Sequence, residues 1–398
     1  MKINNKIVFK KACAVILAVT LPLSLTGCMP YIELKNESIV EGMGIDFEKN
    51  QYNITFQIYN TQSSGGGGEE AKKSGGSSKV KILQSTGESL FDAVRNATLQ
   101  NGRKLYFSNI RAFIVGDEVS KNHFAELLDF MERNQQIKPT ERIFAAKGKA
   151  SDILSFKQDD EIVPAVSIQQ MAQSNTETSK VPDVELLDIF NSMASGLTDS
   201  VVTAISIGKT GDKKNIQLSG TAVIHNNKLA GYLDYNQTKG FMWITGQGKG
   251  GVVVTKLPQG GIVTSEIMGC SSKISVSGNE KKPVIDVSVK TQTNITEINT
   301  NKEYIINDKF LETVKKMQNE EIKKEINLAI KQALHTYDSD IFGFGKKIFE
   351  DKPEMWKKLS GKWSETVKKL DVKISVNSDV KHIGLTNKPT FPQKTTAS

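Results

Sequence analysis

Cys28 is the residue whose type and setting point most directly to a chemical event. It ends the stretch Leu25-Thr26-Gly27-Cys28, which follows the apolar run from Ala12 to Leu25. A thiol can take a diacylglyceryl group as a thioether, and the small residues before it give a signal peptidase access to the preceding bond. The run has 14 residues, too few to span a bilayer, and four lysines precede it. We therefore predict a cleaved signal peptide over residues 1–27 and a lipid anchor on Cys28, whose two or more acyl chains hold a protein stably at a membrane.

The other residues able to do chemistry do not form a recognisable catalytic or metal site. The four histidines lie far apart, and none has a second ligand at metal-binding spacing. Cys270 has no partner thiol in the mature chain, so we expect a small buried apolar residue rather than a redox group. The sequence therefore predicts a protein that is not an enzyme and needs no cofactor or metal. The histidines are His123, His225, His335 and His382.

Two further stretches have simple structural interpretations. The Gly-rich stretch Gly246–Gly251 lacks the Ser or Thr that must follow the Gly-Lys of a phosphate loop, so we predict a loop between two strands. The acidic stretch Asp159–Glu161 lacks the alternating spacing of a calcium loop, so we predict a solvated loop.

Composition narrows the class of protein. The whole chain has a formal net charge of +8, and four of its cations lie in the signal peptide, which leaves a mild positive charge on the mature part. Without an arginine-rich run or a basic stripe with aromatic residues, a nucleic-acid partner is not expected. The 371 residues that remain after removal of 27 from 398 are enough for two or three domains.

The first part of the mature chain, residues 28–198, reads as an α/β domain. Two alternating strands are expected within 39–59, with a turn at Glu48–Asn50, followed by a flexible Gly-rich loop over 61–79. Ser85-Thr86-Gly87-Glu88 predicts a capping box that opens a helix. The apolar faces of the two main helices are Leu90, Ala93, Val94 and Ala97, and Phe124, Leu127, Leu128 and Met131.

The rest of the chain predicts a β-rich domain over 199–298, a third domain over 299–385 and a polar tail over 386–398. The third domain has a long helix from Asp308 to His335 and a last strand at Asp371–Val376. The predicted class is α+β (mixed α/β), a lipid-anchored ectodomain of several domains. The strands expected between Val201 and Gln292 are Val201–Ile207, Leu218–His225, Lys228–Asp234, Gly240–Thr245, Val252–Lys256, Ile262–Met268, Lys273–Ser277 and Val284–Gln292.

Several passages resemble the GerAC, or Ger(x)C, family of spore germination lipoproteins. The most specific is Tyr337-Asp338-Ser339-Asp340-Ile341-Phe342-Gly343-Phe344-Gly345, followed by Pro353, Trp356 and Trp363. The other similar passages are Gly42–Asp46, Ala93–Arg95, Gly102–Ser108, Asp129–Arg133, and the hairpin-like group Gly220–Ile224, Lys228–Leu233 and Lys239–Trp243.

The resemblance implies a non-enzymatic subunit, the C subunit of a nutrient germinant receptor. It implies assembly with integral-membrane A and B subunits at the outer face of the spore inner membrane. Two other functions stay open: a lipid-anchored solute-binding protein that captures a small nutrient, and a wall-active hydrolase. The first would need a deep cleft between two lobes, and the second would need an acidic pair or metal spacing.

The glycine-aromatic passage has two interpretations. Phe342, Gly343, Phe344 and Gly345 follow a helix end, and their apolar rings could dock a turn into the core. The same residues, with Asp340, Trp356 and Trp363, could instead form an exposed contact for a partner subunit. Glycines on both sides of Phe344 suit a tight turn, so a structural role fits either interpretation.

Overall fold

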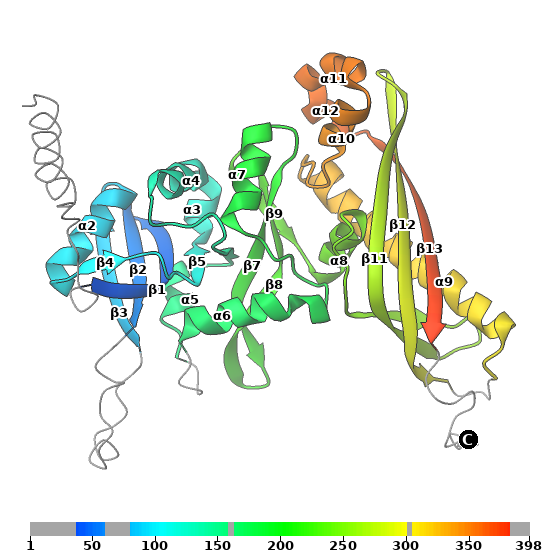
Figure 1. Cartoon of the computed structure of the whole chain (residues 1–398), viewed down its shortest axis with the longest axis horizontal. Helices are drawn as coiled ribbons and strands as arrows, with labels where there is room; N and C mark the ends of the chain where they lie inside the picture. Colours follow the sequence, from blue (N-terminus) through cyan, green and yellow to red (C-terminus); the bar gives the residue numbers. More distant parts are fainter. Residues whose placement is uncertain (1–36, 60–79, 158–162, 301–304, 383–398) are drawn as a thin grey trace, which may run out of the picture.

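The computed structural model describes residues 37–59, 80–157, 163–300 and 305–382. Its strands form two sheets that lie one after the other along the molecule (Figure 1). Cys28, the predicted signal peptide over 1–27, the predicted loop over 61–79, Asp159–Glu161 and the predicted tail over 386–398 lie outside the described residues. No helix among those that are described has the length and apolarity to cross a membrane.

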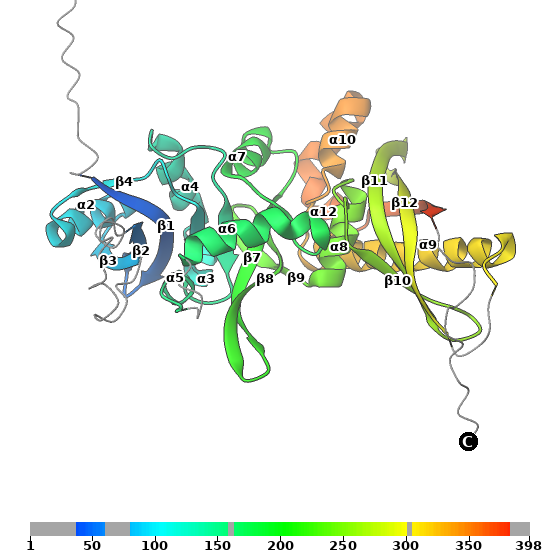
Figure 2. The ribbon, with the colours of Figure 1, turned by 60° about the horizontal axis from the view of Figure 1, so that its bottom comes forward.

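The first sheet has nine strands and is covered by helices on both faces (Figures 1 and 2). β1, β5, β6 and β7 run parallel at its centre, while β2 and β3 on one side and β8 and β9 on the other are antiparallel additions. The strands are β1 (Glu37–Glu48), β2 (Gln51–Tyr59), β3 (Val80–Gly87), β4 (Lys104–Tyr106), β5 (Ala112–Val115), β6 (Ile143–Ala146), β7 (Ser200–Thr210), β8 (Lys213–His225) and β9 (Lys228–Leu233).

Successive side chains of the central strands point to opposite faces of the sheet, and each face is covered by a layer of helices. In β5, Phe113 and Val115 pack into one core, and Ala112 and Ile114 pack into the core on the opposite face. The first core includes the apolar faces of α2 and α4, and the second those of α5 and α6. The helices of this half are α2 (Leu90–Asn101), α3 (Asp117–Asn122), α4 (Phe124–Arg133), α5 (Ala150–Leu154), α6 (Pro164–Gln173), η4 (Ser174–Glu177) and α7 (Leu186–Ser195).

The second sheet has four strands in the order β10-β11-β12-β13. In β12 the residues Ile285, Val287 and Val289 alternate inward and pack with Ile322 and Ile326 of α9. β13 lies parallel to β12, with Val284 opposite Asp371. The elements of this half are α8 (Tyr235–Ile244), β10 (Val252–Lys256), β11 (Ile262–Asn279), β12 (Lys282–Asn299), α9 (Asp308–Ile330), η5 (Lys331–Thr336), α10 (Phe344–Asp351), α11 (Pro353–Leu359), η6 (Ser360–Lys362), α12 (Trp363–Val367) and β13 (Asp371–His382).

The mixed α+β class is confirmed, and both helical faces predicted in the first half are buried. The long helix begins at Asp308 as predicted, but its last turn before Thr336 is a π-helical turn. The strands Ile262–Met268 and Lys273–Ser277 are one strand, β11, with an irregularity near Gly269.

Two local predictions were wrong because a nearby capping residue was missed. Ser85 belongs to β3, and Ser89 caps α2 by accepting a hydrogen bond from the Asp92 backbone N–H at 3.2 Å. Gly240–Thr245 is not a strand, because the carboxylate of Asp234 and the side chain of Gln237 form a capping box that opens α8. The stretch Gly246–Gly251 therefore joins a helix to a strand, and the resemblance of Lys239–Trp243 to part of a hairpin was misread.

The predicted division between residues 198 and 199 does not fall at a break in the sheet. β7 begins at Ser200 and pairs in parallel with β6, so β7, β8 and β9 complete the first sheet. The change from one sheet to the other lies in α8, between β9 and β10.

Candidate functional site at the junction of the two sheets

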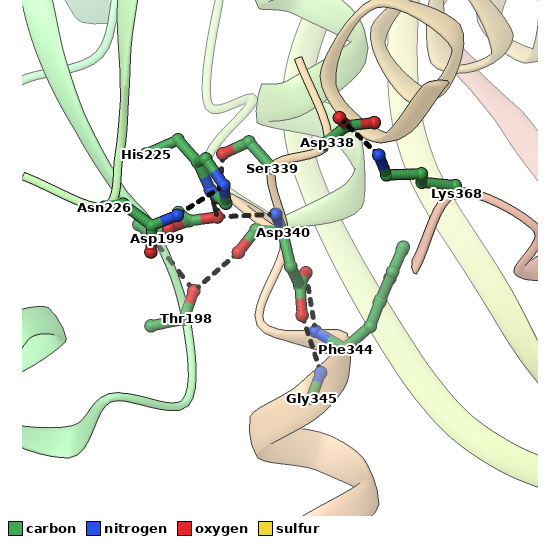
Figure 3. A network of polar contacts seen from close by, with 10 residues as sticks. All are labelled: Thr198, Asp199, His225, Asn226, Asp338, Ser339, Asp340, Phe344, Gly345 and Lys368. Atoms are coloured by element: carbon green, nitrogen blue, oxygen red, sulfur yellow. Dashed lines mark hydrogen bonds and ion pairs between the residues drawn. The ribbon is translucent and has the colours of Figure 1, made fainter. Parts of the chain in front are cut away.

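The passage Tyr337–Gly345 meets the first sheet at one end of β7 (Figure 3). Asp199 precedes β7, and His225 is the last residue of β8. Ser339 and Asp340 lie between η5 and α10 in the second half of the chain. Folding thus brings together groups separated by about 140 positions in the sequence.

Asp199 is the centre of this contact. Its Oδ2 atom accepts hydrogen bonds from Ser339 Oγ at 2.9 Å and from the Asp340 backbone N–H at 2.9 Å, and it lies 3.0 Å from His225 Nδ1. A proton on Nδ1 satisfies the last contact. The hydrogen bond to Asp199 raises the pKa of His225 above its usual value, against the effect of burial. One carboxylate therefore joins both halves of the chain.

Asp340 is buried and uses nearly all of its polar atoms within the chain. Its carboxylate accepts hydrogen bonds from the backbone N–H groups of Phe344 at 3.0 Å and Gly345 at 2.6 Å, and so caps the start of α10. Its carbonyl oxygen accepts from the Asp199 backbone N–H and from Thr198 Oγ1, each at 3.0 Å. Burial is the main cause that raises the pKa of Asp340 to about 6, although these donors oppose it.

The aromatic residues of the passage face inward. Phe342 is 5% exposed and Phe344 is fully buried, and their rings stack with centroids 5.2 Å apart. Gly343 has a φ of 75°, which favours glycine in the turn between them. These two rings are thus core residues, and an exposed contact with a partner does not fit them.

Gly345 lies where α10 approaches the two tryptophans. A Cβ atom there would be 3.1 Å from Trp356 Cη2, 3.1 Å from Trp363 Cε2 and 3.0 Å from the Leu197 carbonyl oxygen. The two indole rings are half-buried and meet edge to face, with centroids 5.3 Å apart. A side chain at this position would crowd all three neighbours, so the glycine suits the close packing of the C-terminal helices against the first half.

Tyr337 forms a second set of hydrogen bonds between the C-terminal half of the chain and the first sheet. Its hydroxyl donates to the Tyr232 carbonyl oxygen at 3.0 Å and accepts from the Tyr232 backbone N–H at 3.1 Å. The ring covers Gly231 of β9, where an added Cβ would lie 2.4 Å from the Tyr337 ring. This contact gives a physical reason for the glycine in the passage Lys228–Leu233.

A separate polar cluster lies between α8 and α9. Lys239 Nζ is 2.9 Å from Glu325 Oε1, and Trp243 Nε1 donates to Glu325 Oε2 at 2.7 Å. Lys239 also donates to the Val252 carbonyl oxygen of β10 at 3.0 Å. All three side chains are largely buried, so this cluster fixes the second sheet to its helices.

The geometry of the junction does not form a nucleophile relay. Ser339 and His225 bond to the same oxygen of Asp199, whereas a Ser-His-Asp relay needs the imidazole between the hydroxyl and the carboxylate. Over the described ranges, no three His, Cys, Asp or Glu side chains are grouped as a metal site. The half-buried Cys270 thiol has its pKa raised by burial to about 11, which keeps it protonated and unreactive at neutral pH.

The residues on one side of the junction were predicted from the sequence, and those on the other side were not. Asp340, Phe342, Gly343, Phe344, Gly345, Trp356 and Trp363 lie together as one packed unit, while Cys28 lies outside the described residues. Asp199, His225 and Ser339 were not predicted as a group, because they are distant in sequence and carry no spacing signal. A cavity of about 340 Å³ adjoins them, lined in part by Asn227, Ser360 and Trp363.

Comparisons with known proteins agree over most of the chain. Residues 30–207 match the family model described as the spore germination protein N-terminal domain, and residues 219–384 match that described as spore germination B3/GerAC like, C-terminal. The chain is 25% identical to spore germination protein YndF of Bacillus subtilis (strain 168), covering 93% of this chain and 96% of that protein. It is 22% identical to spore germination protein B3 of the same organism, covering 92% and 96%.

A solved structure has the same fold. The crystal structure of the GerBC protein superposes with a TM-score of 0.57 at 19% identity, covering 85% of this chain and 96% of that one. The family matches include the passage 337–345 and the Asp199 that it contacts. This chain belongs to the GerAC family of spore germination proteins.

Proposed function

We propose that this chain is the C subunit of a nutrient germinant receptor, a non-enzymatic lipoprotein needed for nutrient-triggered germination. The observation that carries the proposal is the match of two germination family models to residues 30–207 and 219–384. The stretch Leu25–Cys28 adds a lipid anchor, which would hold the chain at the outer face of the spore inner membrane.

The chemistry of the junction supports a role that involves no catalysis. Asp340 caps a helix, and the acceptor oxygen of Asp199 serves three donors of the same chain. A general acid or base must be free to exchange a proton with a substrate. These carboxylates instead fix the position of one half of the chain relative to the other. A subunit that presents surfaces to partners needs such a rigid arrangement.

The partners we propose are the integral-membrane A and B subunits of the receptor. A shared membrane confines the subunits to one surface, which raises the effective concentration of each for the others. A contact between them can therefore be weak in solution and still persist in the spore.

Deletion of the gene in spores tests this function. Deletion should abolish or slow the response to one class of nutrient, while germination triggered by calcium dipicolinate, downstream of the receptors, should be much less affected. Cross-linking in spore membranes should recover the A and B subunits with this chain. Normal responses to every nutrient in a strain without any other C subunit, or cross-links to cell-wall enzymes alone, would contradict the proposal.

Solute capture is the second candidate, favoured by the polar cavity of about 340 Å³ beside Asp199. Direct binding of a nutrient there should raise the unfolding temperature of the lipoprotein in a concentration-dependent way. A substitution of a polar lining residue, Asn227→Ala, should remove that shift. Shifts that are equal in the wild type and the variant would exclude this cavity as the binding site.

A further inference from the structure

The C-terminal end of α2 carries an exposed apolar side chain among cations. Leu99 is 85% exposed, the largest exposed fraction of any large apolar side chain among the described residues. Arg95 lies one helical turn before it and therefore on the same side of α2. Arg103 and Lys104 are exposed and follow directly after the helix ends. We call Arg95, Leu99, Arg103 and Lys104 the α2 basic face.

The segment that carries these residues is positively charged, although Glu37 of β1 lies opposite Lys104. The sequence has no Asp or Glu between Ala93 and Gly116. At the other end of α2 lie Glu88 and Asp92, so the helix has acids at its start and cations at its end. Across the described residues, none of the three cations of the α2 basic face forms an ion pair. They are therefore available to an anionic partner.

The position of the proposed anchor places this face near a bilayer. β1 begins at Glu37, nine residues after Cys28, and nine fully extended residues reach at most about 32 Å. Glu37 lies opposite Lys104 in the pairing of β1 with β4, so the chain enters the fold beside the α2 basic face. Figure 2 shows α2 and β4 at the end of the molecule where β1 begins, with α9 toward the opposite end.

We propose that the α2 basic face rests on an anionic bilayer surface, with Leu99 in the headgroup region and the three cations near lipid phosphates. The proposal rests on the proposed lipid anchor. Attraction of exposed cations to anionic lipid acts within about 10 Å at 0.1 M salt, so it needs the close approach that the anchor provides. The second sheet then projects away from the membrane (Figure 1).

A lipid surface fits this face better than a protein surface does. A stable protein interface has an apolar core depleted of charge and surrounded by a polar rim. Here Leu99 lies close in sequence to Arg95, Arg103 and Lys104, and the Arg95 guanidinium also lies 4.6 Å from the centre of the half-exposed Phe91 ring. Apolar side chains next to arginine and lysine are typical of segments that bind at the surface of anionic membranes. A single exposed leucine is common on proteins. Leu99 differs from such a residue in its position beside the cations and the proposed anchor.

The test uses the lipidated full chain in vesicles. A Leu99→Cys variant in a Cys270→Ser background is labelled with an environment-sensitive fluorophore, since Cys28 is blocked by its lipid. In vesicles of phosphatidylcholine and phosphatidylglycerol, emission at position 99 should shift to shorter wavelength and be quenched by lipids with a quencher near the headgroup. A label at Met268→Cys, 53% exposed on β11, should show neither effect.

Reversing the charge of the three cations provides a second test. The triple variant Arg95→Glu, Arg103→Glu and Lys104→Glu should lose the quenching at position 99, as should the parent protein in pure phosphatidylcholine. The matched control reverses three exposed lysines of the second half and should keep the quenching. That control is Lys316→Glu, Lys331→Glu and Lys369→Glu.

Vesicle flotation separates this proposal from the anchor itself. A chain that floats with vesicles while position 99 stays unquenched overturns the α2 basic face and leaves the anchor intact. Quenching equal in neutral and anionic vesicles overturns the role of the cations. Protection of position 99 only in spore membranes that contain the A and B subunits would assign this face to a protein partner and also overturn the proposal. A chain that does not float contradicts the anchor.

Discussion

Asp199 and Asp340 hold each other through two hydrogen bonds that run in opposite directions. The Asp340 backbone N–H donates to Asp199 Oδ2 at 2.9 Å, and the Asp199 backbone N–H donates to the Asp340 carbonyl oxygen at 3.0 Å. The two residues belong to different halves of the chain. Loss of either side should therefore loosen the relation between the two sheets as well as the local turn.

Asp199→Ala should lower the free energy of unfolding by about 2–4 kcal/mol, because Ser339, His225 and the Asp340 N–H lose a charged acceptor. Urea unfolding followed by circular dichroism measures the change. Asp129→Ala is the control, since Asp129 forms an exposed pair with Arg133 one turn along α4. Equal midpoints for the two variants would show that the junction adds little to stability.

Gly240→Ala should destabilise the protein by roughly 1–3 kcal/mol, although alanine favours helices. A Cβ at this position of α8 would lie 2.0 Å from the Glu325 carbonyl oxygen and 2.8 Å from Ala329 Cβ of α9. Gly361→Ala is the matched control, because no atom lies within 4 Å of its added Cβ. The thermal midpoint should fall for the first variant and stay or rise for the second; a rise in both would mean that α8 can move away from α9 at little cost.

Glu141 should make the protein less stable as the pH rises. Both of its carboxylate oxygens are buried without a hydrogen-bond partner among the described residues, and burial raises its pKa from 4.5 to about 8. Between these two values the unfolded state releases the proton and the folded state keeps it. Stability should thus decrease by up to about 1.4 kcal/mol per pH unit, and the loss should level off above pH 8.

Glu141→Gln removes this titration and is the way to check it. The variant should match the wild type in stability below about pH 4.5 and exceed it increasingly up to about pH 8. Urea unfolding at several pH values gives the comparison. A difference between the two proteins that does not depend on pH would show that Glu141 is ionised in the folded state.

Cys28→Ala should move the protein from the membrane fraction to the soluble or unprocessed fraction, because alanine cannot carry the thioether lipid. Fractionation with immunoblotting and mass spectrometry of the mature N-terminus check this. Cys270→Ala is the control and should stay with the membrane. If the Cys28 variant matures normally and still partitions with membranes, the lipobox interpretation is wrong.

Helices were predicted correctly from the sequence where apolar residues repeat at helical spacing. The prediction was wrong for α8, where the residues that cap the helix were overlooked. The apolar residues of α2 and α4 repeat at helical spacing, so their buried faces followed directly. In α8 every residue from Thr238 to Ile244 is buried, so no amphipathic period distinguished the helix from a strand. The Asp234–Gln237 capping box was the available signal.

The junction could be predicted on one side only. Asp340 to Gly345 form a short continuous passage, which resemblance to a family can identify. Asp199 and His225 are neighbours because the antiparallel pairing of β7 with β8 sets Ser200 opposite Ile224. Ser339 reaches them from a segment 140 positions away in the sequence. A contact over that separation leaves no mark in local periodicity, so this grouping required the structure.

The parallel pairing of β13 with β12 has a consequence for the order of synthesis. All strands of the first sheet lie between Glu37 and Leu233, so its full set of partners exists once that segment has been made. β13 begins at Asp371, and the second sheet remains without one edge until the last part of the chain emerges. Contacts this distant in sequence form slowly. A late frameshift or stop codon would therefore spare the first sheet and leave β12 as an unpaired edge, open to association with other chains.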